Sequence, residues 1–116
     1  MKKLLLALLL TNFVTTTALA GFEEGFIAYI DNDFPLALKE LIPLAKQGHV
    51  QAQTTLALMY AHGHGVKQDQ AKSAEWFHQA AKQGDVIGQK FLGKMYRDGQ
   101  GVKQDYALAA SWYQQA

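Results

Sequence analysis

Residues Gly63–Asp69 read GHGVKQD, and 36 residues later Gly99–Asp105 read GQGVKQD. Glycine is favoured just past the end of a helix, because it adopts the left-handed conformation without a side-chain clash. Aspartate is favoured directly before a helix, because its carboxylate accepts hydrogen bonds from the first amides. The two stretches therefore predict the same element twice, a tight turn between two helices. A phosphate-binding loop is the competing interpretation, but such a loop precedes a helix, whereas these glycines follow one.

The repetition extends beyond the turns. Aligned without gaps, Val50–Ala80 and Val86–Ala116 are identical at 16 of 31 positions. A partial third copy lies upstream, where AKQG at Ala45–Gly48 matches AKQG at Ala81–Gly84. A fixed period of this size is typical of solenoids, whose units cannot bury their apolar faces without a neighbour. We therefore expect an all-α fold, an α/α superhelical solenoid of antiparallel helix pairs.

Apolar residues at helical spacing predict where these pairs lie. The expected pairs are Phe22–Gln47, Val50–Lys82 and Val86–Ala116, with turns near Asp31–Asp33, Gly63–Gln68 and Gly99–Gln104.

Three residues within the pairs carry expectations of their own. Trp76 is expected to be largely buried between neighbouring helices. Pro43 lacks a backbone donor and is expected to bend or break its helix. Gly93 replaces Ala57 of the preceding copy, and we expect it to let the neighbouring helix approach closely with its tryptophan.

The first 20 residues are typical of an export signal. Lys2 and Lys3 precede the apolar run Leu4–Leu10, and Ala18-Leu19-Ala20 places small residues where a signal peptidase reads them. We expect cleavage after Ala20, no membrane insertion afterwards, and a periplasmic or secreted mature protein. A membrane-spanning helix is the competing interpretation, but the apolar run is too short for one.

The length and composition of the chain narrow the classes of function. A chain of 116 residues allows one domain, and its net charge of +1 becomes −1 when Lys2 and Lys3 are removed. This balance favours neither nucleic acid nor an acidic membrane surface as a partner. The chain has no cysteine, so packing must stabilise the fold without disulfides.

Residues 52–84 read AQTTLALMYAHGHGVKQDQAKSAEWFHQAAKQG. This run resembles the Sel1-like repeat, a relative of the tetratricopeptide repeat, and the resemblance covers Val50–Ala116. It implies an α/α superhelix that acts as an adaptor or scaffold for other proteins. The implied organisation is a signal peptide at 1–20, an N-terminal half-repeat at 21–49, a full repeat at 50–85, and a repeat at 86–116 that lacks its last turn.

An enzyme is the alternative class. Some cysteine-rich relatives of the family have been described as β-lactamases. Here the only serines are Ser73 and Ser111, neither opens an S-x-x-K motif, and there is no cysteine nucleophile. We therefore expect no catalysis. A small hydrolase of the β-lactamase-associated repeat type remains the alternative, and a periplasmic regulator that inhibits another protein is a third possibility.

The histidines are the remaining candidates for chemistry. His62 and His64 flank Gly63, close enough to share a metal ion. The second copy has Asp98 and Gln100 at these places, and the sequence fixes no third ligand. Surface histidines are the better interpretation, and the sequence predicts no metal or cofactor.

The positions where the two copies differ indicate a binding surface. Thr54, Leu58 and Ala61 on the first helix of one copy become Lys90, Lys94 and Arg97 in the next. The first helices of such solenoids usually line the concave surface, where a peptide binds. The predicted partner is another protein or peptide, with an acidic segment opposite the basic side chains. The residues predicted to bind it are Thr54, Leu58, Lys90, Lys94 and Arg97. An ordinary solvated face is the alternative.

The last helix carries a further expectation. The second copy stops before the closing AKQG and presents Leu108, Ala109, Trp112 and Tyr113. Apolar surface left open in this way marks an interaction site or an incomplete chain. We expect self-association or docking through the C-terminal end, unless the sequence is part of a longer repeat array.

Overall fold

The computed structural model describes residues 19–116. The predicted signal, apart from its last two residues, lies outside this range. Residues 19–30 are helical, and within 19–116 no residue is in a strand. The helices that follow are α2 (Phe34–Lys46), α3 (Val50–His62), α4 (Gln70–Lys82), α5 (Val86–Asp98) and α6 (Tyr106–Gln115). The all-α prediction is confirmed.

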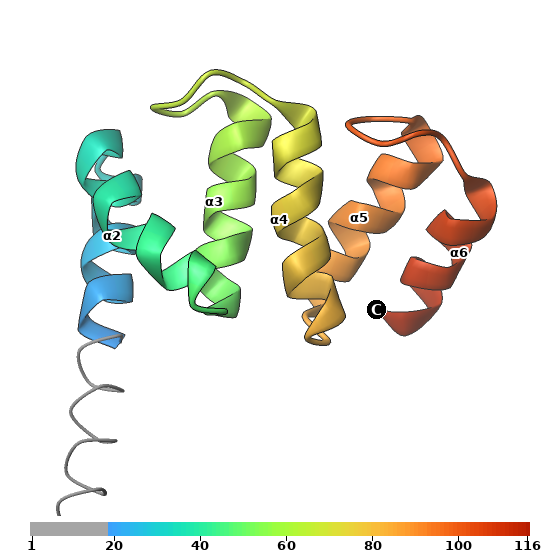
Figure 1. Cartoon of the computed structure of the whole chain (residues 1–116), viewed down its shortest axis with the longest axis horizontal. Helices are drawn as coiled ribbons and strands as arrows, with labels where there is room; N and C mark the ends of the chain where they lie inside the picture. The colour runs from blue at the N-terminus through green and yellow to red at the C-terminus, as the bar shows by residue number, and fades with distance from the viewer. Residues whose placement is uncertain (1–18) are drawn as a thin grey trace, which may run out of the picture.

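The helices form a single row of antiparallel neighbours. Extensive contacts join α2 to α3, α3 to α4, α4 to α5, and α5 to α6. The row extends 55 Å along its longest axis, with residues 19–30 and α2 at one end and α6 at the other (Figure 1). This arrangement confirms the predicted solenoid of helix pairs.

The repeated heptapeptide forms the predicted turn in both copies. Gly63 and Gly99 are left-handed, with φ of 70° and 66°. Asp69 and Asp105 cap the helices that follow, each accepting a hydrogen bond of 3.0 Å from the amide of the third helical residue. Both predictions for these residues, the glycine helix end and the aspartate cap, are confirmed.

The glutamine of the heptapeptide adds a contact that the sequence analysis missed. The side chain of Gln68 donates to the backbone oxygen of Ala61 at 2.8 Å. Gln104 makes the same bond to Arg97 at 2.8 Å. The side-chain amide thereby ties each turn back to the last turn of the preceding helix, which explains why both copies carry this glutamine.

The buried aromatic residue of the repeat is Phe77. Its side chain is 1% exposed and lies in a cluster with Ala57, Ala74 and Met95. Trp76 is only partly buried and packs on the rims of two clusters. The predicted burial of Trp76 between neighbouring helices is therefore confirmed in part, and the fully buried position is that of Phe77, because neighbouring positions on a helix point in different directions and Phe77 faces the core.

The expectations for Pro43 and Gly93 are each corrected in part. Helix α2 continues through Pro43 to Lys46, so the helix is not broken there, and the expected bend stays a prediction. Pro43 lies in the last turn, where its missing amide costs one hydrogen bond. At Gly93, an added Cβ would lie 3.1 Å from the ring of Tyr113. The close approach is therefore made by Tyr113 and not by the neighbouring tryptophan.

Within residues 19–116, no helix has both the length and the apolar character that crossing a bilayer requires.

Candidate protein-binding surface

A groove of about 290 Å³ lies between the first helices of the two repeats, α3 and α5, with α4 as its base. Its apolar lining includes Phe77 and Phe91, whose rings stack with centroids 4.7 Å apart. Both copies of the repeat contribute side chains, so stacking of the units creates the groove. The full lining is Leu58, Ala61, His62, Gln68, Gln70, Ser73, Phe77, Phe91, Lys94, Met95 and Gln100.

Ser73 is the unusual member of this lining. Its side chain is fully buried, and its Oγ has no hydrogen-bond partner among the described residues. Serine inside a helix commonly donates to the backbone carbonyl four residues earlier. A buried hydroxyl without a partner costs roughly 1–3 kcal/mol.

The charge on the groove is positive. Lys94 lines it, Lys90 lies one turn earlier on α5, and both side chains are exposed. The lining contains no aspartate or glutamate. The one ion pair found in residues 19–116 does not involve either lysine. Both ammonium groups are therefore available to an acidic partner.

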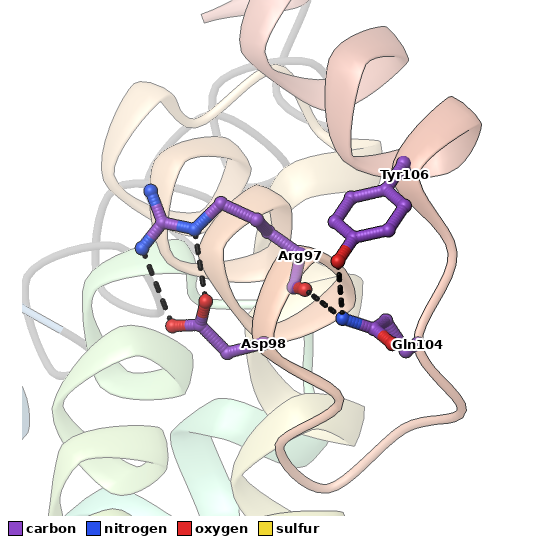
Figure 2. Close-up of polar contacts among 4 residues, drawn as sticks. All are labelled: Arg97, Asp98, Gln104 and Tyr106. Carbon is purple, nitrogen blue, oxygen red and sulfur yellow. Dashed lines mark hydrogen bonds and ion pairs between the residues drawn. The ribbon is translucent and has the colours of Figure 1, made fainter.

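Arg97, the third predicted basic residue, is already engaged. Its Nε donates to Oδ1 of Asp98 at 2.9 Å, and its Nη2 to Oδ2 at 3.3 Å (Figure 2). This hydrogen bonding lowers the pKa of the Asp98 carboxyl and raises the pKa of Arg97. The neighbouring aspartate thus neutralises one end of the predicted basic stripe.

The two predicted binding residues on α3 differ from each other. Leu58 is partly buried and lines the groove. Thr54 is 9% exposed, and its hydroxyl donates to the backbone oxygen of Gln51 at 3.1 Å. This short side chain folds back onto its own helix, so Thr54 offers no exposed group to a partner. The structure thus brings together Leu58 and Lys94, and it leaves Thr54 outside the site.

The paired histidines hold the turn in place. His62 and His64 have ring centroids 5.4 Å apart. The ring of His64 also stacks on Phe34, and its Nδ1 lies 3.3 Å from the hydroxyl of Tyr29. His64 therefore joins the first turn to the N-terminal helix pair. Among residues 19–116, no group of three or more potential ligands is arranged to hold a metal ion.

A larger groove, of about 550 Å³, lies where the end of α2 meets α3 and α4, beside Trp76. Two of its polar side chains, Gln53 and Gln83, bond to each other. Gln83 donates to Oε1 of Gln53 at 3.0 Å and to the backbone oxygen of Gly48 at 3.1 Å. The smaller groove is formed by both repeats and has the predicted binding residues Leu58 and Lys94 in its lining, so it is taken as the candidate binding site.

Comparisons with known proteins agree with this architecture. The Sel1 repeat family matches residues 50–85 and 86–116. A solved structure described as a protective antigen of uropathogenic Escherichia coli strains, displaying an SLR fold, is 35% identical with a TM-score of 0.80, and the match covers 87% of this chain. The present chain spans 22% of that antigen's chain.

A second solved structure, a Sel1 repeat protein from Oxalobacter formigenes, is 34% identical with a TM-score of 0.79. The match covers 95% of this chain and 86% of that one. No curated protein matches the sequence.

Proposed function

The chain belongs to the Sel1 repeat family, and from this premise we propose that it is an exported protein-interaction module that holds an acidic peptide segment in the groove between α3 and α5. Sel1 repeats commonly mediate protein–protein interaction. In this proposal the protein acts as an adaptor, or as a regulator of another periplasmic or secreted protein, without catalysis of its own.

The lining of the groove carries this proposal. Phe91, which is 39% exposed, and the partly buried Leu58 offer an apolar surface that suits one apolar side chain of a peptide. Lys94 at the rim offers a charge for a carboxylate. An apolar anchor next to an acidic residue is therefore the ligand chemistry that suits these groups best.

Two substitutions test the site with a library of immobilised peptides that combine one apolar residue with acidic neighbours. We expect the protein to select such peptides, and Lys94→Glu to weaken binding roughly fivefold, about 1 kcal/mol, because a rim charge contributes about that much. The matched control is Lys39→Glu, a reversal on the exposed side of α2. Equal binding by the Lys94 and Lys39 variants would contradict the assignment of the groove.

Ser73→Ala gives an independent test. The second copy already has Ala109 at this position. Removing an unpartnered buried hydroxyl is expected to leave the free energy of unfolding unchanged or raise it by about 1 kcal/mol. Peptide binding is expected to stay unchanged, because the hydroxyl is fully buried. Weaker binding by Ser73→Ala would contradict this expectation.

The absence of catalysis is part of the proposal. A serine nucleophile needs a base within hydrogen-bond reach, and Ser73 has no partner in residues 19–116. We expect no turnover of the β-lactam reporter nitrocefin by the purified protein. Turnover that Ser73→Ala or Ser111→Ala abolished would favour the hydrolase alternative.

Export rests on the leader-like residues 1–20. Mass spectrometry of the protein from a bacterial envelope fraction is expected to show a chain beginning at Gly21. A chain that retains Met1 and fractionates with membranes would contradict this part of the proposal.

A further inference from the structure

The two ends of the solenoid differ in charge. At the N-terminal end, a groove of about 460 Å³ lies between residues 19–30 and the start of α2. Its charged residues are all acidic, and Ile27 within it is 58% exposed. The one ion pair of the described chain lies elsewhere. The four carboxylates of this acidic groove belong to Glu23, Glu24, Asp31 and Asp33.

The C-terminal end is apolar and basic. Helix α6 contains no charged residue, and its Leu108 and Tyr113 are 42% and 40% exposed. Beside it, α5 presents Lys90 and Lys94. In a single molecule this end and the acidic groove lie at opposite ends of the long axis (Figure 1), so they cannot meet within one chain.

Helix α4, inside the solenoid, shows how the second helix of a pair is covered by the next pair. α4 packs against α5, the first helix of the next pair, and this contact buries Phe77 to 1% exposure. Tyr113 is the counterpart of Phe77 on α6 and is far more exposed. Residues 19–30 are the first helix of the N-terminal pair, and they therefore correspond to α5. In a second copy, this segment is the helix that can cover α6 as α5 covers α4.

The charges agree with this stacking. Aligning Tyr29 with Tyr96, which both lie near the ends of first helices, places Glu23 at the level of Lys90. First helices of consecutive pairs lie side by side, since residues of both α3 and α5 line one groove. Glu23 and Glu24 of one copy would then lie opposite Lys90 and Lys94 of the next.

We propose that the protein associates head to tail, with α6 and the two lysines of one copy docked on the acidic groove of a second copy. The contact joins two different surfaces, so an assembly of any length keeps one free acidic groove and one free α6 end. The mean number of copies per assembly therefore rises with protein concentration. This head-to-tail contact is linked to the proposed function by one residue, because Lys94 is assigned both to the peptide groove and to the contact between copies. A bound acidic peptide is therefore expected to compete with assembly.

The test is the weight-average mass of the purified chain, measured by light scattering after size exclusion over a series of concentrations at low salt. We expect the mass to rise to at least twice that of the monomer, and to fall when salt screens the charges. Two double variants, E23K/E24K and K90E/K94E, change one end each. Each variant alone is expected to stay monomeric, because E23K/E24K places lysines opposite Lys90 and Lys94, and K90E/K94E places glutamates opposite Glu23 and Glu24.

Mixing the two variants is the decisive arm. Lysines at positions 23 and 24 of one variant meet glutamates at positions 90 and 94 of the other, so the mixture is expected to regain the higher mass. Glu75→Lys, a reversal on the exposed side of α4, is the control and is expected to assemble like the parent. Melting temperatures near that of the parent establish that the variants are folded.

Two results would overturn the proposal. A parent protein that stays monomeric at every concentration has no such contact. Association that survives E23K/E24K unchanged would show that two α6 helices pair with each other instead. Peptide binding by the dilute E23K/E24K monomer is measured separately, so a failed assembly and a failed peptide site can be told apart.

Discussion

The α3–α4 pair and the α5–α6 pair are built from nearly the same sequence, yet they bury it differently. Phe77 is 1% exposed, whereas its counterpart Tyr113 is 40% exposed. Ala80 is fully buried, whereas its counterpart Ala116 is exposed. The residue pattern forms the same helices and turn in both pairs, but the burial of each residue depends on whether another helix pair packs on it.

The same contrast holds for a buried amide. Gln53 and Gln89 each donate to the backbone oxygen eight residues earlier, at 3.0 and 3.3 Å. The Oε1 of Gln53 accepts from Gln83. The Oε1 of Gln89 is buried and has no partner in residues 19–116. The second pair therefore retains an unsatisfied acceptor where the first pair has a complete network.

Truncating the two aromatic rings is expected to give the largest difference between the pairs. Phe77→Ala empties a fully packed site and is expected to cost about 3–5 kcal/mol of unfolding free energy. Tyr113→Ala is expected to cost less than half as much, because its ring is already partly in water. Urea denaturation of dilute protein measures both values. Equal costs would show that the last helix is packed as tightly as α4.

A smaller contrast is expected between two glycines of α5. An added Cβ at Gly88 would lie 2.9 Å from the backbone nitrogen of Ala81 and 3.0 Å from the backbone oxygen of Phe77. These atoms cannot move without shifting α4, so Gly88→Ala is expected to destabilise the fold by about 1–3 kcal/mol. At Gly93 the obstacle is the ring of Tyr113, on a helix with an open face.

For Gly93→Ala, a gain in helix propensity of about 1 kcal/mol offsets the shift of that ring. The net change in unfolding free energy is expected to be close to zero. Thermal melts of the two variants at one dilute concentration decide the point. A larger loss for Gly93→Ala than for Gly88→Ala would mean that α6 is the more rigid neighbour.

The two aspartate caps extend the comparison to local stability. Removing either cap is expected to cost about 1 kcal/mol. In Asp69→Ala the loss affects global unfolding, because α4 packs on helices at both sides. In Asp105→Ala the main effect is fraying of α6. Circular dichroism at moderate temperature should show early loss of helix only for Asp105→Ala, and the opposite order would contradict the account.

The smallest expected effect concerns pH. The pKa of His78 lies below the ordinary histidine value, mainly because partial burial disfavours the imidazolium and also because Lys82 is positive. The unfolded chain therefore binds a proton at a higher pH than the folded chain. Stability from this group is present above the unfolded pKa and is lost as the pH falls through the folded value.

His78→Gln places in α4 the residue that α6 has at the same position, Gln114. This variant is expected to lose less stability than the parent between neutral pH and pH 5, by a small margin. Denaturation curves at matched pH values measure it. A parent that became more stable on acidification over this range would reverse the expected sign.

The parts of the fold that follow from local chemistry could be predicted from sequence. The glycine helix ends and aspartate caps depend on one residue and its neighbouring backbone, so the heptapeptide predicts them directly. The role of Gln68 and Gln104 could also have been predicted, because glutamine recurs at the same place in both turns. The period of the repeat predicted the solenoid, because the same residues recur at a fixed spacing in both copies.

The parts that depend on neighbouring helices could not be predicted. Trp76 and Phe77 are adjacent large aromatic residues, and the sequence does not say which of them faces α5. Thr54 occupied a promising position, but its hydroxyl bonds to its own helix. Arg97 pairs with the next residue, Asp98, which reduces the predicted stripe to two lysines. The groove with the unpaired Ser73 exists only because two repeats stack.

Hydrogen exchange along α4 and α6 tests the central claim most directly, because it measures how far a neighbouring helix protects each of them. In dilute solution we expect the amides of α4 to be strongly protected and those of α6 to exchange much faster. At high concentration, exchange in α6 and in residues 19–30 is expected to slow together, while α4 stays unchanged. Equal protection of α4 and α6 in dilute solution would contradict the claim that the last pair is left uncovered.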